Sequence, residues 1–389
     1  MPQGAHMARP SKKAAQVSGT MKILVLGGAG DMARDALDEL AKESVVQGVT
    51  IADLNLDKAK QEALKRDSRF SACRLDAGEH SQVVELMRRH DIALGFAGPF
   101  YYFERRLAEA ALEAGIPYIS IADDYEAYLD VLNLDEKARA KSVHILTGWG
   151  NSPGITQALA RKGYNSMDDP KRINVHWAAG SNEAAGPANL THLFNIFHGT
   201  TLQTIRGQEV QVPTGGGRKL VRFPFPMGDL PVYYTGHAES VSIPRNLKGL
   251  SEVTLHGGVQ PSYIPLLIMA LEKTGLFNTH ARRKKAAEFF YRIESLFGAG
   301  GLDKSVGRVD IYGLNKGTTA HRTYTYLGHI GQITSIPCTV AALWELSGKF
   351  KKASGGVYSP ERLLEDPDPF LAEIMRRGVE IFFHEDGLD

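Results

Sequence analysis

The sequence predicts an α/β fold in which a parallel sheet carries helices on both faces. Apolar runs typical of buried strands alternate with amphipathic segments through residues 22–148, and three glycines within four positions break the chain directly after the first run. The third observation is length, since 389 residues exceed the size at which one hydrophobic core keeps growing. We therefore expect two domains.

The expected elements follow each other in a β-α-β order. The first helix, residues 31–43, has apolar side chains at helical spacing at Met32, Ala36, Leu37 and Leu40. Further helices are expected over residues 79–90 and 103–115. The expected strands are residues 22–27, 49–53, 71–77, 91–98, 117–122 and 143–148. This alternation is typical of a doubly wound, Rossmann-type sheet.

Composition excludes several classes of function. The formal net charge of +1 gives no electrostatic case for nucleic acid or an anionic membrane, and the longest apolar run is far shorter than the roughly 20 residues that span a bilayer. Two cysteines rule out a disulfide framework and suit a reducing, cytoplasmic compartment. No histidine–carboxylate spacing typical of a zinc site recurs, so no metal is expected. Residues 1–20 are interpreted as a tag remnant and a polar leader outside the fold.

The glycine turn has the spacing of a dinucleotide-binding loop. Gly28 to Ala33 fits G-x-G-x-x-A between a strand and a helix, and Asp53 ends the next strand. Backbone N–H groups there would bind a pyrophosphate, while Asp53 would accept hydrogen bonds from the ribose and repel a 2′-phosphate. This favours NAD over NADP. The alternative is an ordinary strand–helix turn. The candidate cofactor residues in this part of the chain are Gly28, Ala29, Gly30, Asp31, Met32, Asp53 and Asp76, of which Asp76 is equally well interpreted as a turn or capping acid.

Polar and aromatic residues follow the later strands, at the sheet edge where ligands bind in such folds. Gly98 and Pro99 break the chain after the fourth strand and are cofactor candidates, and Phe100 and Tyr101 would overhang that edge. Asp123 and Asp124 follow the fifth strand, where they would bind a substrate ammonium or, alternatively, cap the next helix. Ser152 and Pro153 open a helix after the sixth strand and are further cofactor candidates.

Several blocks in order resemble the saccharopine dehydrogenase family. They are "VLGGAGDMA", "VTIADLNLDKA", "RLDAGE", "GFAGPF", "GNSPGITQALA", "TSIPCTVAALWEL" and "GGVYSPERLLEDPDPFLAEIMRRGVEI". The resemblance implies a discontinuous plan, with residues 21–155 and 333–389 in the nucleotide-binding domain and 156–332 in an α+β domain for substrate binding and dimerisation. It also implies action on amines such as saccharopine, lysine at its ε-carbon or carboxynorspermidine. The acid at the second strand and the SPG turn are most similar to the lysine 6-dehydrogenase and saccharopine dehydrogenase-like branch.

Oxidation of an amine needs a group that moves protons and a group that holds the substrate. His237 and Glu239 are the first candidates for proton transfer, because their two-residue spacing would place both on one face of a strand. An exposed, unrelated pair is the alternative. Arg245 is a candidate clamp for a carboxylate. His192 lies on the apolar stripe of an expected helix and is interpreted as a core residue.

The sequence thus predicts an NAD-preferring homodimeric oxidoreductase that acts on the CH–NH bond of an amino acid or amino-acid-derived amine. Asp124 joins His237 and Glu239 as a catalytic candidate, and Asp123, Phe100, Tyr101 and Arg245 are the substrate-binding candidates. The alternative is a non-catalytic NAD(H)-binding regulator or scaffold of the same fold.

Overall fold

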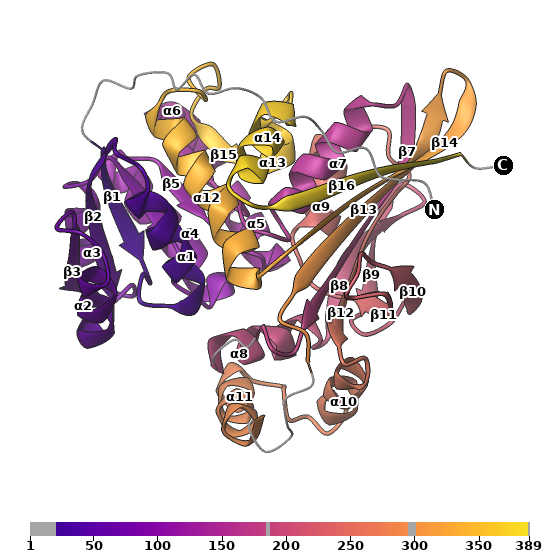
Figure 1. Cartoon of the computed structure of the whole chain (residues 1–389), viewed down its shortest axis with the longest axis horizontal. Helices are drawn as coiled ribbons and strands as arrows, with labels where there is room; N and C mark the ends of the chain where they lie inside the picture. Colours follow the sequence, from indigo (N-terminus) through magenta and orange to yellow (C-terminus); the bar gives the residue numbers. More distant parts are fainter. Residues whose placement is uncertain (1–20, 184–186, 295–300, 388–389) are drawn as a thin grey trace.

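The computed structural model describes residues 21–183, 187–294 and 301–387. The expected leader, residues 1–20, lies outside this range. Two sheets stand side by side, with the nucleotide-binding domain on the left of Figure 1 and the second sheet on the right.

The first sheet contains seven parallel strands in the order β15-β6-β5-β4-β1-β2-β3, which is the strand order of a Rossmann fold with one added strand. The predicted doubly wound sheet is therefore confirmed. Its strands are β1 (Met21–Leu26), β2 (Val46–Asp53), β3 (Phe70–Arg74), β4 (Ile92–Gly95), β5 (Tyr118–Ser120), β6 (His144–Leu146) and β15 (Gly356–Tyr358).

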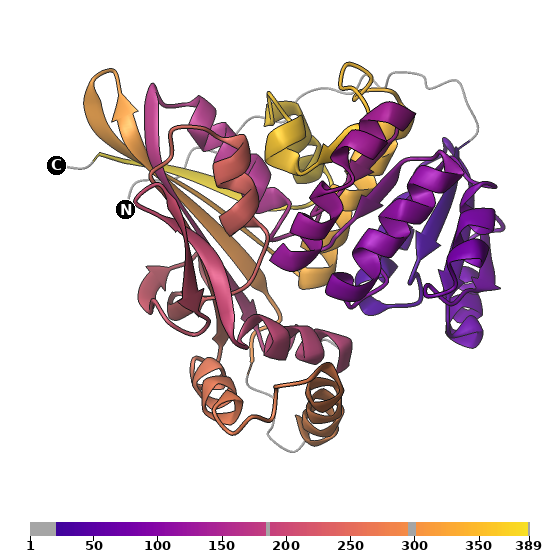
Figure 2. The same ribbon diagram turned by 180° about the vertical axis from the view of Figure 1, so that it is seen from behind.

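Helices cover both faces of this sheet. Ala36, Leu37 and Leu40 of the first helix are buried on one face, as their spacing predicts, and Met32 is partly buried against the same core. That face carries α1 (Asp31–Ala41), α2 (Leu56–Leu64) and α12 (Ile330–Leu346), and the other face carries α3 (His80–Met87), α4 (Phe100–Ala114), α5 (Tyr125–Leu132) and α6 (Asp135–Lys141), which are in front in Figure 2. The late helix α12 packs along α1. The expected return of the C-terminal helices to the first domain is thus observed.

The short helices α13 (Pro360–Leu363) and α14 (Asp368–Arg376) pack near α7 (Ile155–Asn165). Trp149, fully buried after β6, contacts the rings of Phe350 and Phe370 from this late segment. These contacts fix the C-terminal part of the chain against the carboxyl edge of the first sheet.

The second sheet has the strand order β10-β11-β12-β7-β13-β14-β16, with β8 and β9 attached at β12. Its strands are β7 (Asp169–Gly180), β8 (Thr200–Ile205), β9 (Gln208–Pro213), β10 (Lys219–Arg222), β11 (Asp229–Tyr234), β12 (Glu252–Gln260), β13 (Ser305–Asn315), β14 (Thr318–Gly328) and β16 (Glu380–Gly387). β13 and β14 form an antiparallel hairpin.

One boundary differs from the expectation. β16 pairs antiparallel with β14, so the last described strand belongs to the second sheet and not to the nucleotide-binding domain. Without β16, β14 would be an edge strand with unpaired backbone groups, and β16 supplies the hydrogen-bond partners for those groups.

The remaining helices of the second domain are α8 (Pro187–Ile196), α9 (Glu239–Asn246), α10 (Tyr263–Glu272) and α11 (His280–Glu294). α8, α10 and α11 lie together at one end of the second sheet, below the carboxyl edge of the first in Figure 1. None of the helices in the described ranges has the length and apolar character needed to cross a membrane.

Candidate active site

The turn between β1 and α1 is closed around glycine. Gly27 has φ +73°, and a Cβ there would lie 2.7 Å from the backbone of Ala97 in the loop after β4. Glycine is therefore required for the loops after β1 and β4 to meet, at the point where strand order reverses and dinucleotides bind in this fold.

The start of α1 has the donor set that a pyrophosphate needs. Gly30 is the N-cap residue, and no side-chain cap is found there among the described residues. The first backbone N–H groups of that turn and the positive end of the helix dipole would bind an anion. The residues present fit an NAD(P) pyrophosphate.

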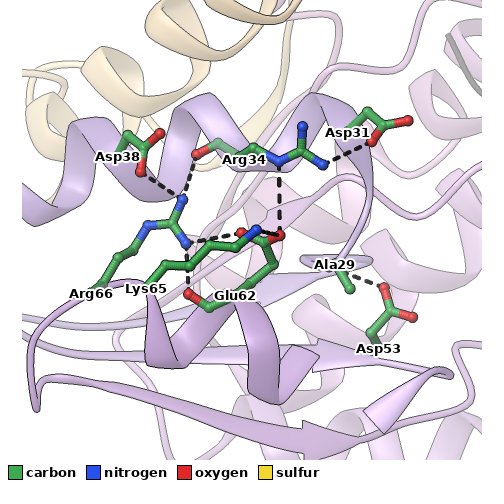
Figure 3. Close-up of polar contacts among 8 residues, drawn as sticks. All are labelled: Ala29, Asp31, Arg34, Asp38, Asp53, Glu62, Lys65 and Arg66. Atoms are coloured by element: carbon green, nitrogen blue, oxygen red, sulfur yellow. Dashed lines mark hydrogen bonds and ion pairs between the residues drawn. The ribbon is translucent and has the colours of Figure 1, made fainter. Parts of the chain in front are cut away.

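Asp53 lies against this loop. Its Oδ2 accepts a hydrogen bond from the backbone N–H of Ala29 at 3.1 Å (Figure 3). Its Oδ1 accepts from the N–H of Asn55 at 2.9 Å. The carboxylate that the motif places about 20 residues after the glycines is thus held beside the glycine loop, where a ribose would lie. Asp76 instead accepts from the N–H of Gly78 at 2.8 Å, which is the ordinary turn that the sequence left open.

Arginines beside the loop are engaged with carboxylates. Arg34 contacts Asp31 at 3.0 Å and Glu62 at 3.7 Å, and Arg66 pairs with Asp38 at 2.6 Å and Glu62 at 3.1 Å (Figure 3). This network ties α1 to the end of α2. It also supplies both guanidinium groups with carboxylate partners.

At the carboxyl end of β5 the two domains join through their backbones. His237 forms an antiparallel bridge with Asp124, and the N–H of Ala238 donates to the carbonyl of Asp123 at 3.0 Å. The segment after β11 therefore continues the edge of the first sheet, which places the His237 side chain beside the two aspartates.

A histidine from α8 completes this cluster. His192 Nε2 lies 3.1 Å from Asp123 Oδ2 and 3.4 Å from His237 Nε2, while His192 Nδ1 lies 3.6 Å from Asp124 Oδ1. We call Asp123, Asp124, His192 and His237 the junction cluster. It brings together two predicted acids, one predicted histidine and one histidine that the sequence assigned to the core.

The side chain of Asp124 accepts two hydrogen bonds. Its Oδ2 accepts from the backbone N–H of Tyr101 at 3.2 Å, and its Oδ1 accepts from the Asn195 amide at 3.2 Å. It occupies the N-cap position of α5 but makes no side-chain hydrogen bond to that helix; it satisfies an N–H in the first turn of α4 instead. The predicted capping alternative is therefore right about the position and wrong about the helix.

Burial shifts the proton affinities in the cluster. It raises the pKa of Asp124 to about 6, with the charge of Asp123 acting in the same direction and that of His192 opposing. Burial likewise raises the pKa of Asp123. Burial and the charge of His192 hold the pKa of His237 well below its usual range, so this imidazole is neutral.

The predicted pairing of His237 with Glu239 on a strand is wrong. β11 ends at Tyr234, and Glu239 begins α9, so the two side chains leave different kinds of structure. Glu239 is fully buried, and its Oε1 accepts from Ser152 Oγ at 2.5 Å and Thr156 Oγ1 at 2.7 Å. Burial raises the pKa of Glu239 to about 7. The alternative of an exposed pair is also wrong, because both residues are buried.

The other candidates occupy varied positions. Arg245, in the last turn of α9, is ion-paired with Glu209 at 2.5 Å. Ser152 and Pro153 are buried, and the Ser152 hydroxyl is used by Glu239. Phe100 packs against the core at the start of α4, and the Tyr101 hydroxyl contacts His280 of α11. Gly98 is exposed, with open space where a Cβ would lie.

Sequence reasoning missed His192. A usable signal was present, since His192 and Asn195 are three residues apart and therefore share one face of α8. Both reach Asp124. A histidine and an amide at this spacing on one helix face indicate that the face is turned toward a polar site.

Part of the first domain matches a known family model. Residues 23–146 match the model described as "Saccharopine dehydrogenase NADP binding domain". For these residues the match confirms the resemblance drawn from the sequence blocks.

Comparison of the whole chain agrees with this assignment. A carboxyaminopropylagmatine dehydrogenase from Synechocystis sp. is 24% identical over 394 aligned positions, which cover 92% of this chain and 96% of that protein. Among solved structures, an apo saccharopine dehydrogenase (L-Glu forming) from Saccharomyces cerevisiae superposes with a TM-score of 0.70 at 16% identity, covering 95% of this chain and 100% of that one. A homospermidine synthase from Legionella pneumophila in complex with NAD gives a TM-score of 0.61 at 12% identity, covering 94% of this chain and 91% of that one. Because these matches cover nearly the whole chain, they show that this protein shares the fold of both of its domains with those two structures.

Proposed function

We propose that the protein is an NAD(P)-dependent oxidoreductase that acts on the CH–NH group of an amino acid or an amino-acid-derived amine. The observation that carries the proposal is the junction cluster, in which His192 of the second domain meets Asp123 and Asp124 at the carboxyl end of β5. That end of the sheet is where the nicotinamide of a dinucleotide lies in Rossmann folds.

The cofactor, bound by the Gly27–Gly30 turn and Asp53, supplies the hydride acceptor or donor. The chain's own residues hold the amine and handle its protons. Asp123 Oδ1 is buried without a hydrogen-bond partner in the described residues, so it is free to accept from a substrate ammonium. An amine must lose a proton before hydride can leave its carbon, and His192 lies within reach of the same carboxylate to take it.

His192 is a better proton acceptor than His237 on this geometry. It contacts two carboxylates and is partly exposed, whereas burial and the neighbouring His192 disfavour protonation of His237. Asp124, fixed by Tyr101 and Asn195, would orient His192 through Nδ1. The proposal therefore moves the acid–base role predicted for His237 and Glu239 to His192 and its two aspartates.

We propose NAD as the preferred cofactor. Asp53 beside the loop would repel a 2′-phosphate, and Arg34 and Arg66 are already paired with carboxylates. We also propose that the protein works in a reducing, cytoplasmic compartment and as a homodimer formed through the second sheet. Light scattering of the purified protein tests the dimer, and a monomer at micromolar concentration would contradict it.

The names of the relatives support an amine substrate, since carboxyaminopropylagmatine, homospermidine and saccharopine all contain a secondary amine. The alternative, a non-catalytic NAD(H)-binding regulator, would use the glycine loop but not the junction cluster.

A substrate screen separates these functions. Purified, EDTA-treated protein is incubated with NAD or NADP and with saccharopine, lysine, diaminopimelate or polyamine conjugates, while the absorbance of reduced nicotinamide is followed. The reverse reaction is run with NADH, a carbonyl compound and a primary amine. We expect one secondary amine or amino acid to reduce NAD, with the product identified by mass spectrometry. NAD binding without turnover of any amine in either direction would favour the regulator.

A further inference from the structure

Three side chains of the junction cluster have the composition of a metal-binding site. Asp123, His192 and His237 each present one ligand atom, and these atoms all lie within 4.8 Å of one another. They come from three segments: the loop after β5, helix α8, and the loop between β11 and α9. No sequence spacing links them, so the motif search for zinc-like intervals had no pattern to find.

Two of the three ligand-to-ligand distances match those around a shared ion, and the third pair, Asp123 and His237, lies within 4.8 Å. Two imidazole nitrogens, His192 Nε2 and His237 Nε2, face each other at 3.4 Å, beyond the 2.7–3.2 Å typical of an N–H hydrogen bond. Zinc–nitrogen bonds of roughly 2.0–2.1 Å in a tetrahedron place neighbouring ligand atoms about 3.3–3.4 Å apart. The 3.1 Å between His192 Nε2 and Asp123 Oδ2 is also close to such an edge.

The surroundings place polar and aromatic groups beside the ligands. With His192 Nε2 turned to Asp123 and His237, its Nδ1 lies on the side of Asp124, 3.6 Å from Oδ1, so a carboxylate is near the nitrogen that an ion would leave free. The ring of His237 is stacked on Trp177, with centroids 5.2 Å apart and planes 8° apart. Asp123 Oδ1 is buried and has no hydrogen-bond partner among the described residues. His192 and Asp123 side chains remain about a quarter exposed, at 26% and 24%, which gives an ion access from solvent.

We propose that Asp123, His192 and His237 bind a divalent transition-metal ion of the zinc class, with three protein ligands and a fourth position open to solvent. The ion would bind the lone pairs of the His192 imidazole and the Asp123 carboxylate. In the proposed function these same groups accept the proton and the hydrogen bond of the amine. Metal binding and amine turnover therefore exclude each other, and the ion acts as an inhibitor that competes with the amine. This last consequence rests on the proposed function, whereas metal binding does not.

The test measures binding of Zn²⁺ and Co²⁺ to the EDTA-stripped full-length protein, by equilibrium dialysis with metal analysis and by the visible absorption of Co²⁺. The variants are His192→Gln and Asp123→Asn, both at partly exposed side chains. The matched control is His198→Gln, a histidine just beyond α8 that pairs with Glu272 at 3.2 Å. Circular dichroism verifies that each variant folds.

We expect one equivalent of metal in the wild type and in His198→Gln, and an affinity at least about 10–100-fold weaker in the two cluster variants. Co²⁺ should give the intense absorption of a tetrahedral site only in the wild type and the control. Absence of stoichiometric binding in the wild type, or equal binding in folded His192→Gln, overturns the metal site.

Metal binding and the proposed function fail separately. Stoichiometric Zn²⁺ without turnover of any amine supports the site and contradicts the dehydrogenase. Turnover that Zn²⁺ does not inhibit, in a protein that shows no Co²⁺ spectrum, contradicts the site and leaves the dehydrogenase intact.

Discussion

His192 Nε2 lies 3.1 Å from Asp123 Oδ2, and this contact joins a helix of the second domain to the loop that follows β5 of the first. Neither domain alone contains the pair. Any chemistry that uses both side chains therefore depends on how the two domains are held together. The backbone bridge between His237 and Asp124 is a second contact that holds them.

Asp53→Ala is expected to weaken NAD binding by roughly 10–100-fold, because hydrogen bonds to a charged group contribute about 1.5–3 kcal/mol each. NADP affinity should fall less or rise, since the charge that repels a 2′-phosphate is removed. Dissociation constants for both cofactors come from calorimetry. The control is Asp57→Ala in the first turn of α2. Equal losses of NAD and NADP affinity would contradict the assigned role.

Asp124→Asn is expected to lower kcat by roughly 10²–10³-fold with little change in NAD affinity, since an amide keeps the bond to the Tyr101 N–H but removes one of the two carboxylates beside the proposed proton acceptor, His192. Steady-state kinetics with the amine found in the screen measure this. The control, Asp130→Asn, changes an acid in the same helix region outside the cluster. A variant with unchanged kcat would show that Asp124 serves only to hold α4.

His144 links β6 to α12 through its contact with Glu345, at 2.9 Å. Although burial alone would lower the pKa of His144, its hydrogen bond and charge interaction with Glu345 raise it. A raised folded-state pKa means that the pair stabilises the fold fully below the unfolded pKa and loses this contribution as pH rises through the folded one.

His144→Gln should therefore lower the free energy of unfolding by roughly 1 kcal/mol near pH 6 and by less near about pH 9. Urea unfolding at both pH values measures the difference. His80→Gln is the control, because His80 makes a 2.9 Å contact with Glu113 at an exposed site, where such pairs contribute little. A loss for His144→Gln that grows with pH would contradict this sign.

Asp310 on β13 is a buried carboxylate that accepts several hydrogen bonds. Arg308 binds it through two nitrogens at 2.7 and 2.8 Å, and His321 and Thr323 each donate at 2.7 Å. Burial opposes ionisation, but these hydrogen bonds and the Arg308 charge hold the pKa of Asp310 well below its usual range. Its contribution to stability is therefore present above the unfolded pKa and is lost as pH falls through the folded pKa.

Asp310→Asn is expected to cost roughly 2–4 kcal/mol of unfolding free energy at neutral pH, since a buried charge pair is broken on one side. The penalty should shrink in acid. Thermal unfolding between about pH 7 and pH 3 measures this, with Asp303→Asn, in the described loop before β13, as the control. A penalty that is constant with pH would show that charge is not what Asp310 contributes.

The sequence predicted the first domain well for a physical reason. Strand and helix periods are local, and a Gly27-type turn with positive φ accepts few residues other than glycine, so β1, α1 and Asp53 could be placed from short windows. The position of β16 could not be predicted in this way, because its partner β14 lies far away in the sequence. Their pairing depends on which strand is left at the edge of the second sheet after folding.

The junction cluster was only partly predictable for the same reason. Asp123 and Asp124 follow from their place after β5, whereas His192 became recognisable only once α8 was packed against that edge. His237 was predicted because Glu239 was expected beside it, but Glu239 begins a helix and accepts hydrogen bonds from Ser152 and Thr156 instead. Residue spacing predicts contacts within one element, and these contacts join three.

The most direct test of the account compares wild type and His192→Gln, both EDTA-treated, for amine-dependent reduction of NAD, with NAD affinity measured in parallel. We predict that the wild type reduces NAD with one amine and that His192→Gln loses roughly 10²–10⁴-fold in kcat while it binds NAD normally. Equal turnover by the two proteins would contradict the claim that the junction cluster moves the amine proton.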